Sequence, residues 1–188
     1  GIFFSTIKND PNIDHFETPF SYNVWKKRGH RKAYREKYKE HDLVFLLDNG
    51  NRDWWKPQKH LLDIYAEKCG VTLEQRRPLI YLDAKDIQEA QSKLNELGIS
   101  KNDKLMILAP ETRSKKNIKE WPHDRFISLI DKINKKYDFK IITFVSKENP
   151  YDYNGTISLK GYPLGPSSAM IQKANFYIGL DNGLTHMA

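Results

Sequence analysis

Cysteine is nearly absent from this 188-residue chain, and long apolar runs are missing. The lone Cys69 excludes an internal disulfide and any metal site built from several cysteines, and it suits a reducing compartment. No apolar stretch approaches the roughly 18–20 residues of a membrane-spanning helix. With 39% apolar and 29% charged residues, the composition is that of an ordinary folded protein, long enough for one domain or parts of two.

Several catalytic and binding motifs are missing as well. The chain has no P-loop and no dinucleotide glycine fingerprint, and it has no serine nucleophile elbow. The histidines lack the spacing of a metal-binding pair such as H-E-x-x-H; they are His15, His30, His41, His60, His123 and His186. We therefore expect no metal site.

Positive charge is concentrated in one segment. The formal charge of the chain is +7, and residues 26–41 alone hold eight Lys/Arg and two Glu, so the rest of the chain is close to neutral. Such a segment binds nucleic acid or an anionic membrane surface, or it is a solvated helix face. Tyr34 and Tyr38 share a helical face and are expected to anchor it to the core.

Short apolar runs alternate with amphipathic helical patterns along the chain. Apolar strands without alternation in polarity are typical of a parallel sheet covered by helices on both faces, so the predicted fold class is α/β. The predicted strands are Leu43–Leu47, Leu79–Leu82, Lys104–Ala109, Lys140–Val145, Ile157–Leu159 and Phe176–Gly179. Helices are predicted over 60–69 with Gly70 as its cap, from Asp83 to 97, from Pro122 to 137, over 167–174, and from Leu184 onward. The polar stretch 99–103 predicts a junction between domains 1–98 and 99–188.

Ligands of such sheets bind at the carboxyl ends of strands, which directs attention to loops 110–121, 146–156 and 180–183. In the last of these, Gly183 permits a tight turn and close approach of a ligand. The free N–H groups of a first helical turn can bind an anion such as a pyrophosphate, and His186 lies in that turn. The alternative is that Asp181 only caps a helix and that His186 is a surface residue.

The loop that follows strand 104–109 is rich in cations, namely Arg113, Lys115, Lys116 and Lys119. A cation at the end of a strand can neutralise a phosphate leaving group. The alternative is an ordinary solvated basic loop. Trp121 is expected to anchor the core. Packing is also the expected role of Trp54 and Trp55, and the alternative is that they stack on a base or sugar ring.

Together the two loops resemble those of glycosyltransferase family nine, the bacterial ADP-heptose:lipopolysaccharide heptosyltransferases. The resemblance rests on a Thr-Arg…Lys-x-Trp-Pro loop and a terminal Asp-x-Gly-x-x-His-x-Ala motif. The residues that carry it are Thr112, Arg113, Lys119, Trp121, Pro122, Asp181, Gly183, Leu184, His186 and Ala188. Residues 42–47 followed by 60–65 are similar to the latter part of the family's N-terminal domain.

The resemblance implies a GT-B fold, in which two Rossmann-like domains face a cleft, with sheets incomplete at both ends. Residues 1–98 would form part of the acceptor-side domain and residues 99–188 part of the nucleotide-sugar-binding domain. It implies an inverting enzyme that transfers a sugar, such as heptose from ADP-heptose, to a lipopolysaccharide-type or oligosaccharide acceptor. It also implies a cytoplasmic location with peripheral contact to an anionic inner membrane, no metal or other cofactor, and no nucleic-acid partner.

The resemblance also implies roles for the site residues. Lys119 would neutralise the pyrophosphate, Thr112 would contact the nucleotide sugar, and Asp181 would meet the sugar. The turn at Asn182, Gly183 and Leu184 would hold phosphate through backbone N–H groups, with His186 beside it and Arg113 in the same set.

The sequence departs from the family at three places. Asn182 stands where the family usually has Ser or Thr, so a hydroxyl contact is lost. The opening Gly-Asp turn, which carries the proposed catalytic base, is missing, and the chain stops at Ala188 inside a helix. We therefore expect an interior fragment without its catalytic base, and nothing ties the acids Asp14, Asp48 or Asp53 to that role.

Two alternatives remain open. One is a module that binds nucleic acid or an anionic surface through residues 26–39, for which steep salt dependence of binding would speak. The other is an inactive nucleotide-sugar-binding domain, with which Asn182 would be consistent.

Overall fold

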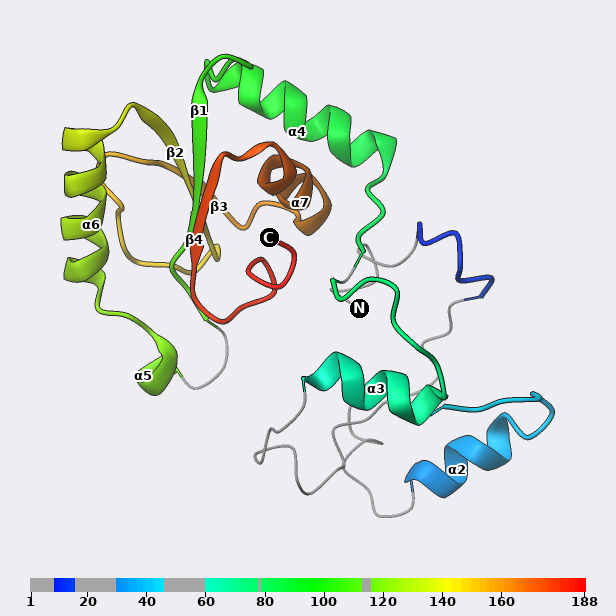
Figure 1. Cartoon of the computed structure of the whole chain (residues 1–188). Coiled ribbons are helices and arrows are strands. Elements are labelled where there is room, and N and C mark those ends of the chain that lie inside the picture. The colour runs from blue at the N-terminus through cyan, green and yellow to red at the C-terminus, as the bar shows by residue number, and fades with distance from the viewer. Residues whose placement is uncertain (1–8, 16–29, 46–59, 78, 113–115) are drawn as a thin grey trace. The chain divides into compact units, whose positions relative to one another are not determined.

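The structure, a computed structural model, describes residues 9–15, 30–45, 60–77, 79–112 and 116–188 (Figure 1). The chain forms two compact units, one of Gly1–His15 with Ile80–Ala188 and the other of Phe16–Leu79. Residues 80–98 therefore group with the C-terminal unit, whereas the predicted junction lies after residue 98. The physical reason is that the helix in this stretch buries Ala90 and Leu94 in the core beside the C-terminal sheet.

The Phe16–Leu79 unit contains two helices among its described residues, α2 (His30–Lys37) and α3 (Leu61–Cys69). The predicted end of α3 is confirmed, because Gly70 adopts a left-handed conformation with φ of 67° and closes the helix. Tyr34 and Tyr38 stack on each other with ring centroids 6.2 Å apart. The strand predicted over 43–47 is wrong for residues 43–45, which are irregular. Residues 46–47, Asp48, Asp53, Trp54 and Trp55 lie outside the described residues.

The other unit is built on a parallel sheet. Its strands are β1 (Lys104–Ala109), β2 (Phe139–Val145), β3 (Ile157–Lys160) and β4 (Phe176–Gly179), in the order β3-β2-β1-β4. All neighbouring pairs are parallel, which confirms the predicted fold class. The chain builds outward from β1 to β3 and then returns to pair β4 with the other side of β1. The strand predicted over 79–82 is wrong, because this stretch runs irregularly into the next helix.

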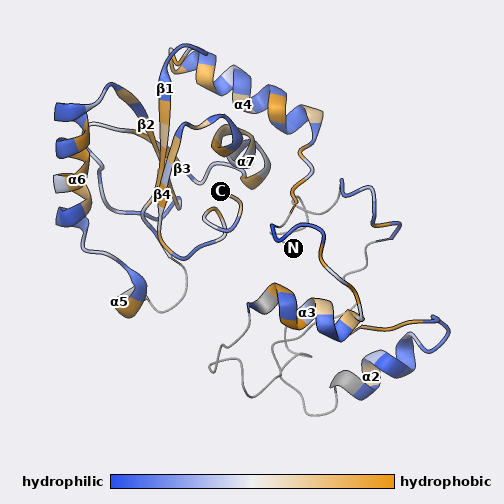
Figure 2. Cartoon of the chain, viewed as in Figure 1, coloured by the Kyte–Doolittle hydropathy of each residue, from blue (hydrophilic) through white to orange (hydrophobic). Residues whose placement is uncertain are grey.

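Both faces of the sheet are buried, as the apolar strands predict. Helix α6 (His123–Lys136) covers one face, and α4 (Ala84–Glu96) and α7 (Leu164–Lys173) cover the other (Figure 1). Successive strand residues point to opposite faces, so Met106 and Leu108 pack on the α6 side. Leu105 and Ile107 pack with Met170 on the other side. Figure 2 shows the resulting apolar strands between helices whose outer faces are polar.

The ends of the elements follow local chemistry. Asp83 caps α4 by accepting from Lys85 N at 2.9 Å. Asn175 fixes the start of β4 against β1, because its Oδ1 accepts from Leu105 N and its own N donates to Leu105 O, both at 2.8 Å. Helix α7 begins three residues before the predicted Ser167, whose Oγ donates back to Pro163 O at 2.7 Å. That bond satisfies a buried hydroxyl inside the helix.

Two further differences concern the loops after β1 and β4. A short helix, α5 (Lys116–Lys119), interrupts the predicted loop 110–121. The helix expected from Leu184 onward is replaced by hydrogen-bonded turns through residues 183–187. In the part of the chain that the structure describes, no helix has the length and apolar character needed to cross a membrane.

Candidate functional site

The loops after β1 and β4 meet at the carboxyl edge of the sheet. Leu180 N donates to Ala109 O at 3.1 Å, which extends the pairing of the two strands by one step. Just beyond it, the buried Thr112 donates its hydroxyl to Asp181 O at 3.1 Å. The strand order reverses between β1 and β4, and open α/β sheets bind ligands at such a reversal.

Three charged or ionisable side chains gather at this point. Lys119 Nζ pairs with one carboxylate oxygen of Asp181, and His186 Nε2 lies 3.3 Å from the other. The hydrogen bond from Lys119 holds the pKa of Asp181 below its usual range, and His186 contributes in the same direction. Lys119 keeps 35% of its side chain exposed, and Asp181 keeps 53%. The pair is therefore open to an incoming anion.

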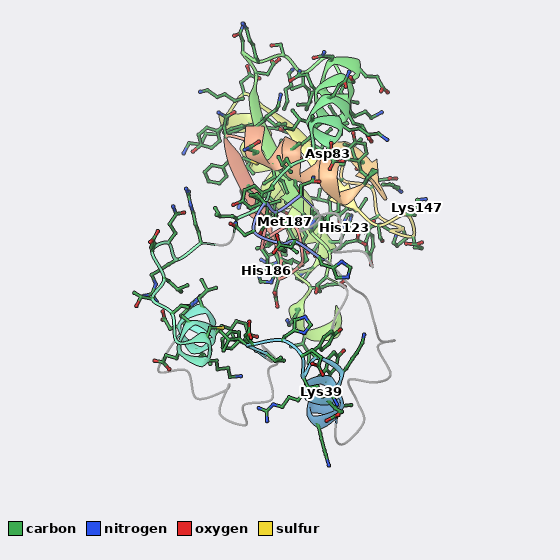
Figure 3. All side chains as sticks on the ribbon, turned by 90° about the vertical axis from the view of Figure 1, so that its right-hand side faces the viewer. Lys39, Asp83, His123, Lys147, His186 and Met187 are labelled. Carbon is green, nitrogen blue, oxygen red and sulfur yellow. The ribbon has the colours of Figure 1, made fainter. Side chains whose placement is uncertain are left out.

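The turn after β4 is held by Asn182 and Thr185. Asn182 Nδ2 donates to Ala109 O at 3.3 Å and to Glu111 O at 2.7 Å, and its Oδ1 accepts from Thr185 N at 3.0 Å. The amide side chain thus joins the two loops to each other. Thr185 Oγ1 bonds to Leu180 O and lies 2.9 Å from Tyr177 OH. Figure 3 labels His186 and Met187 on this turn.

This geometry corrects one part of the anion-binding expectation. Because residues 183–187 form turns, the described residues after β4 supply no helix whose first N–H groups and dipole would attract an anion. Among the described residues of this cluster, the Lys119 ammonium is a positive charge that can attract an anion to this edge of the sheet.

A pocket of about 580 Å³ opens beside the cluster. Its apolar wall includes Phe144, Leu159 and Leu164, and the Tyr162 ring stacks on Phe144 with centroids 6.2 Å apart. Its polar wall includes Glu111, Thr112, Ser146, Glu148, Asn182 and Gly183. All three loops singled out from the sequence contribute to it. A volume of this size fits a ligand of the size of a nucleoside.

The Glu111 carboxylate is a feature that sequence reasoning missed. It accepts from the backbone N–H of Ser146, from Ser146 Oγ at 3.1 Å and from Asn149 Nδ2 at 2.6 Å. It therefore ties the loop after β1 to the loop after β2. The available signal was its place two residues beyond the end of the predicted strand Lys104–Ala109, and this place does not indicate which donors it meets.

The predicted site residues divide into three groups. Thr112, Lys119, Asp181 and His186 lie together, and Asn182, Gly183 and Leu184 line the adjoining pocket. Arg113 lies outside the described residues, as does Lys115. Trp121 was expected in the core, but it is 44% exposed and places its ring edge against Phe126. Among the described residues, no three His, Cys, Asp or Glu side chains are grouped as a metal would require.

The phenol of Tyr153, whose ring packs against His123 in the core cluster with Phe126, is expected to make the stability of the fold depend on pH. Burial raises the pKa of Tyr153 to about 12. Since the folded state favours the protonated phenol, its contribution to stability is present below the ordinary tyrosine pKa and is lost as pH rises from 10 toward 12.

We expect the free energy of unfolding to fall less steeply between pH 10 and 12 in Tyr153→Phe than in the parent. Denaturant titrations at several pH values measure this, with the exposed Tyr137→Phe as the control; equal slopes in both variants would contradict it.

Comparison with known proteins gives a match in structure alone. No family model and no curated protein matches the sequence. The structure of the glycosyl transferase family 9 protein from Veillonella parvula DSM 2008 is 22% identical, with a TM-score of 0.57 over 69% of this chain and 40% of that one. The structure of E. coli ADP-heptose lps heptosyltransferase II is 16% identical, with a TM-score of 0.50 over 64% of this chain and 39% of that one.

The structural similarity covers only part of the two glycosyltransferase structures. The chain spans about two fifths of the length of each of these structures. At these identities the similarity establishes the fold, so the chain has the α/β fold of GT-B glycosyltransferases over the matched part. The resemblance to glycosyltransferase family nine is confirmed at that level.

Proposed function

We propose that this chain belongs to an inverting glycosyltransferase, that residues 99–188 are part of its nucleotide-sugar-binding domain, and that Lys119 binds the diphosphate of the donor. The observation that supports the proposal is the convergence of Thr112, Lys119 and Asp181 where the strand order reverses. The chain also shares the fold of two glycosyltransferase structures over the matched part. Heptose from ADP-heptose is the proposed donor group, and a lipopolysaccharide-type or oligosaccharide acceptor is the proposed recipient.

The chemistry of the reaction fits this charge arrangement. When the bond between the sugar and the diphosphate breaks, negative charge develops on the leaving diphosphate, and a fixed cation nearby lowers the barrier. In the ligand-free protein Lys119 pairs with Asp181. An incoming diphosphate would also accept hydrogen bonds from the Lys119 ammonium. The Asp181 carboxylate could then accept a hydrogen bond from a hydroxyl group of the donor sugar. We propose that the reaction needs no metal, because Lys119 supplies the positive charge.

The pocket beside Lys119 suits the uncharged part of the donor. Glu111 and Glu148 lie on its polar wall, and no Lys or Arg is among the described residues that line it. Such a surface disfavours phosphate. The Glu148 carboxylate can accept hydrogen bonds from the hydroxyl groups of a ribose, whereas that of Glu111 already accepts three from the protein. The apolar wall with Tyr162 offers a face for a base. We therefore propose that the nucleoside binds in the pocket and that the diphosphate binds at its edge.

Calorimetric titration with ADP, UDP, GDP and CDP at constant ionic strength tests this function. We expect selective binding of ADP. Selective binding of another nucleotide would keep the transferase and change the donor. Failure of a demonstrably folded chain to bind any of the four would refute the proposal.

Two parts of the function stay predictions. One is the role of residues 1–98 on the acceptor side. The other is peripheral contact of the basic segment 26–39 with an anionic membrane surface. In its described part, Lys37 lies over the ring of Tyr38 and Lys39 pairs with Glu36, contacts that a solvated helix also makes.

A further inference from the structure

Glu111 accepts hydrogen bonds from two loops that are distant in sequence. On one side, Asn182 Nδ2 donates to the backbone oxygen of Glu111 at 2.7 Å. On the other side, Ser146 and Asn149 donate three hydrogen bonds to its carboxylate. The segments that follow β4, β1 and β2 are thus connected through one residue. We call this set of contacts the Glu111 bridge.

The partners of Glu111 after β2 are themselves well fixed. Asn149 is only 6% exposed. Its Oδ1 accepts from Tyr151 N at 2.8 Å, and its backbone oxygen accepts from Lys160 Nζ at 3.3 Å. Ser146 is the first residue after β2, and Glu111 accepts both its N–H and its hydroxyl. The carboxylate therefore satisfies donors that would otherwise be left without an acceptor near the pocket wall.

From these contacts we infer that Glu111 is a positioning residue that holds the loops after β2 and β4 at a fixed separation and so preforms the nucleotide pocket. The inference rests on the proposed function for the identity of the ligand. An ionised carboxylate only accepts hydrogen bonds, and three protein donors already use this one. Glu111 acts through the loops that it holds, since Ser146, Asn182 and Gly183 line the pocket with it.

The chemistry of the bridge provides a test with two variants, of which the double variant restores the net charge of the parent protein. In Glu111→Gln, an NH₂ group replaces one acceptor oxygen and faces donors, so the bridge is weakened while the side chain keeps its shape. In the double variant Glu111→Gln/Asn149→Asp, the new amide can donate to the new carboxylate, and the hydrogen bond forms in the opposite direction. Glu120→Gln is the matched control, because Glu120 is exposed and lies outside the bridge.

Two readouts separate the bridge from the proposed function. The first is hydrogen exchange of the Ser146 N–H in the ligand-free protein, and the second is ADP affinity by calorimetry. We expect Glu111→Gln to speed exchange and to weaken ADP binding roughly tenfold. We expect the double variant to recover most of both properties and the control to change neither.

Some outcomes would overturn the role of Glu111, and another would overturn only the proposed donor. Unchanged exchange in Glu111→Gln overturns the inference, and so does weaker ADP binding that the double variant does not restore, because Glu111 would then contact the ligand itself. If the parent protein binds no ADP, the proposed donor fails. The exchange rates of the three variants still decide whether the bridge holds the loop.

Discussion

Replacing Lys119 with alanine is expected to weaken the binding of a nucleoside diphosphate by roughly 10- to 100-fold. The physical reason is that a hydrogen bond to a charged group contributes about 1.5–3 kcal/mol, and every 1.4 kcal/mol corresponds to about tenfold in affinity. Lys119 is held at the reversal of strand order by its pair with Asp181. Calorimetric titration with ADP measures the change.

The control for this variant is Lys135→Ala. Lys135 is exposed in the last turn of α6, close to the start of β2 and hence near the opposite edge of the sheet. The two variants carry the same net charge, so a general electrostatic effect would weaken binding equally in both. Equal affinities of Lys119→Ala and Lys135→Ala would show that the diphosphate does not bind at Lys119.

Replacing Ile107 with alanine is expected to lower the free energy of unfolding by about 3–4 kcal/mol. Removing a large aliphatic side chain from a packed interior loses its transfer free energy and leaves a cavity, which together amount to about 2–5 kcal/mol. Ile107 lies at the upper part of this range because it is 0% exposed and sits in β1, with a strand on each side. Urea denaturation at pH 7 measures the change.

Ile118→Ala removes the same atoms from a side chain that is 81% exposed. Its free energy of unfolding should stay within about 0.5 kcal/mol of the parent. A loss below about 1 kcal/mol in Ile107→Ala would mean that the sheet repacks around the missing side chain, or that the packing in β1 is looser than the structure indicates.

The parallel sheet could be predicted because its strands are buried on both faces. The apolar run 105–109 follows Lys104, and the strand predicted over 104–109 has the same bounds as β1. The same reasoning failed for residues 79–82, where Leu79 is 55% exposed and Leu82 packs partly buried against the core without forming a strand. A short apolar run is only consistent with a strand, and it becomes one only when a neighbouring strand is there to pair with it.

The site could be predicted only in part. The family resemblance assigned Lys119 and Asp181 to the same site although they are 62 positions apart in the sequence, and the structure pairs their side chains. The Glu111 bridge escaped prediction because a carboxylate in a polar loop resembles a surface charge until its donors are known. The helix expected after residue 183 is replaced by turns, in which the Asn182 amide accepts from Thr185 N and satisfies one of the free N–H groups.

The two asparagines at the ends of β4 also settle an alignment that the apolar side chains leave open. In a sheet with one solvent-exposed face, a shift of one strand by one residue would expose its apolar side chains. The free-energy cost of this exposure fixes the register of the strands. Here β1 has apolar residues on both faces, so a slipped β1 would still be buried. Asn175 pins Leu105 at one end of the β1–β4 pair, and Asn182 pins Ala109 at the other. A shift of β1 against β4 by one residue would break the hydrogen bonds of both asparagines. The side-chain amides of Asn175 and Asn182 therefore set the position of Thr112 relative to Asp181.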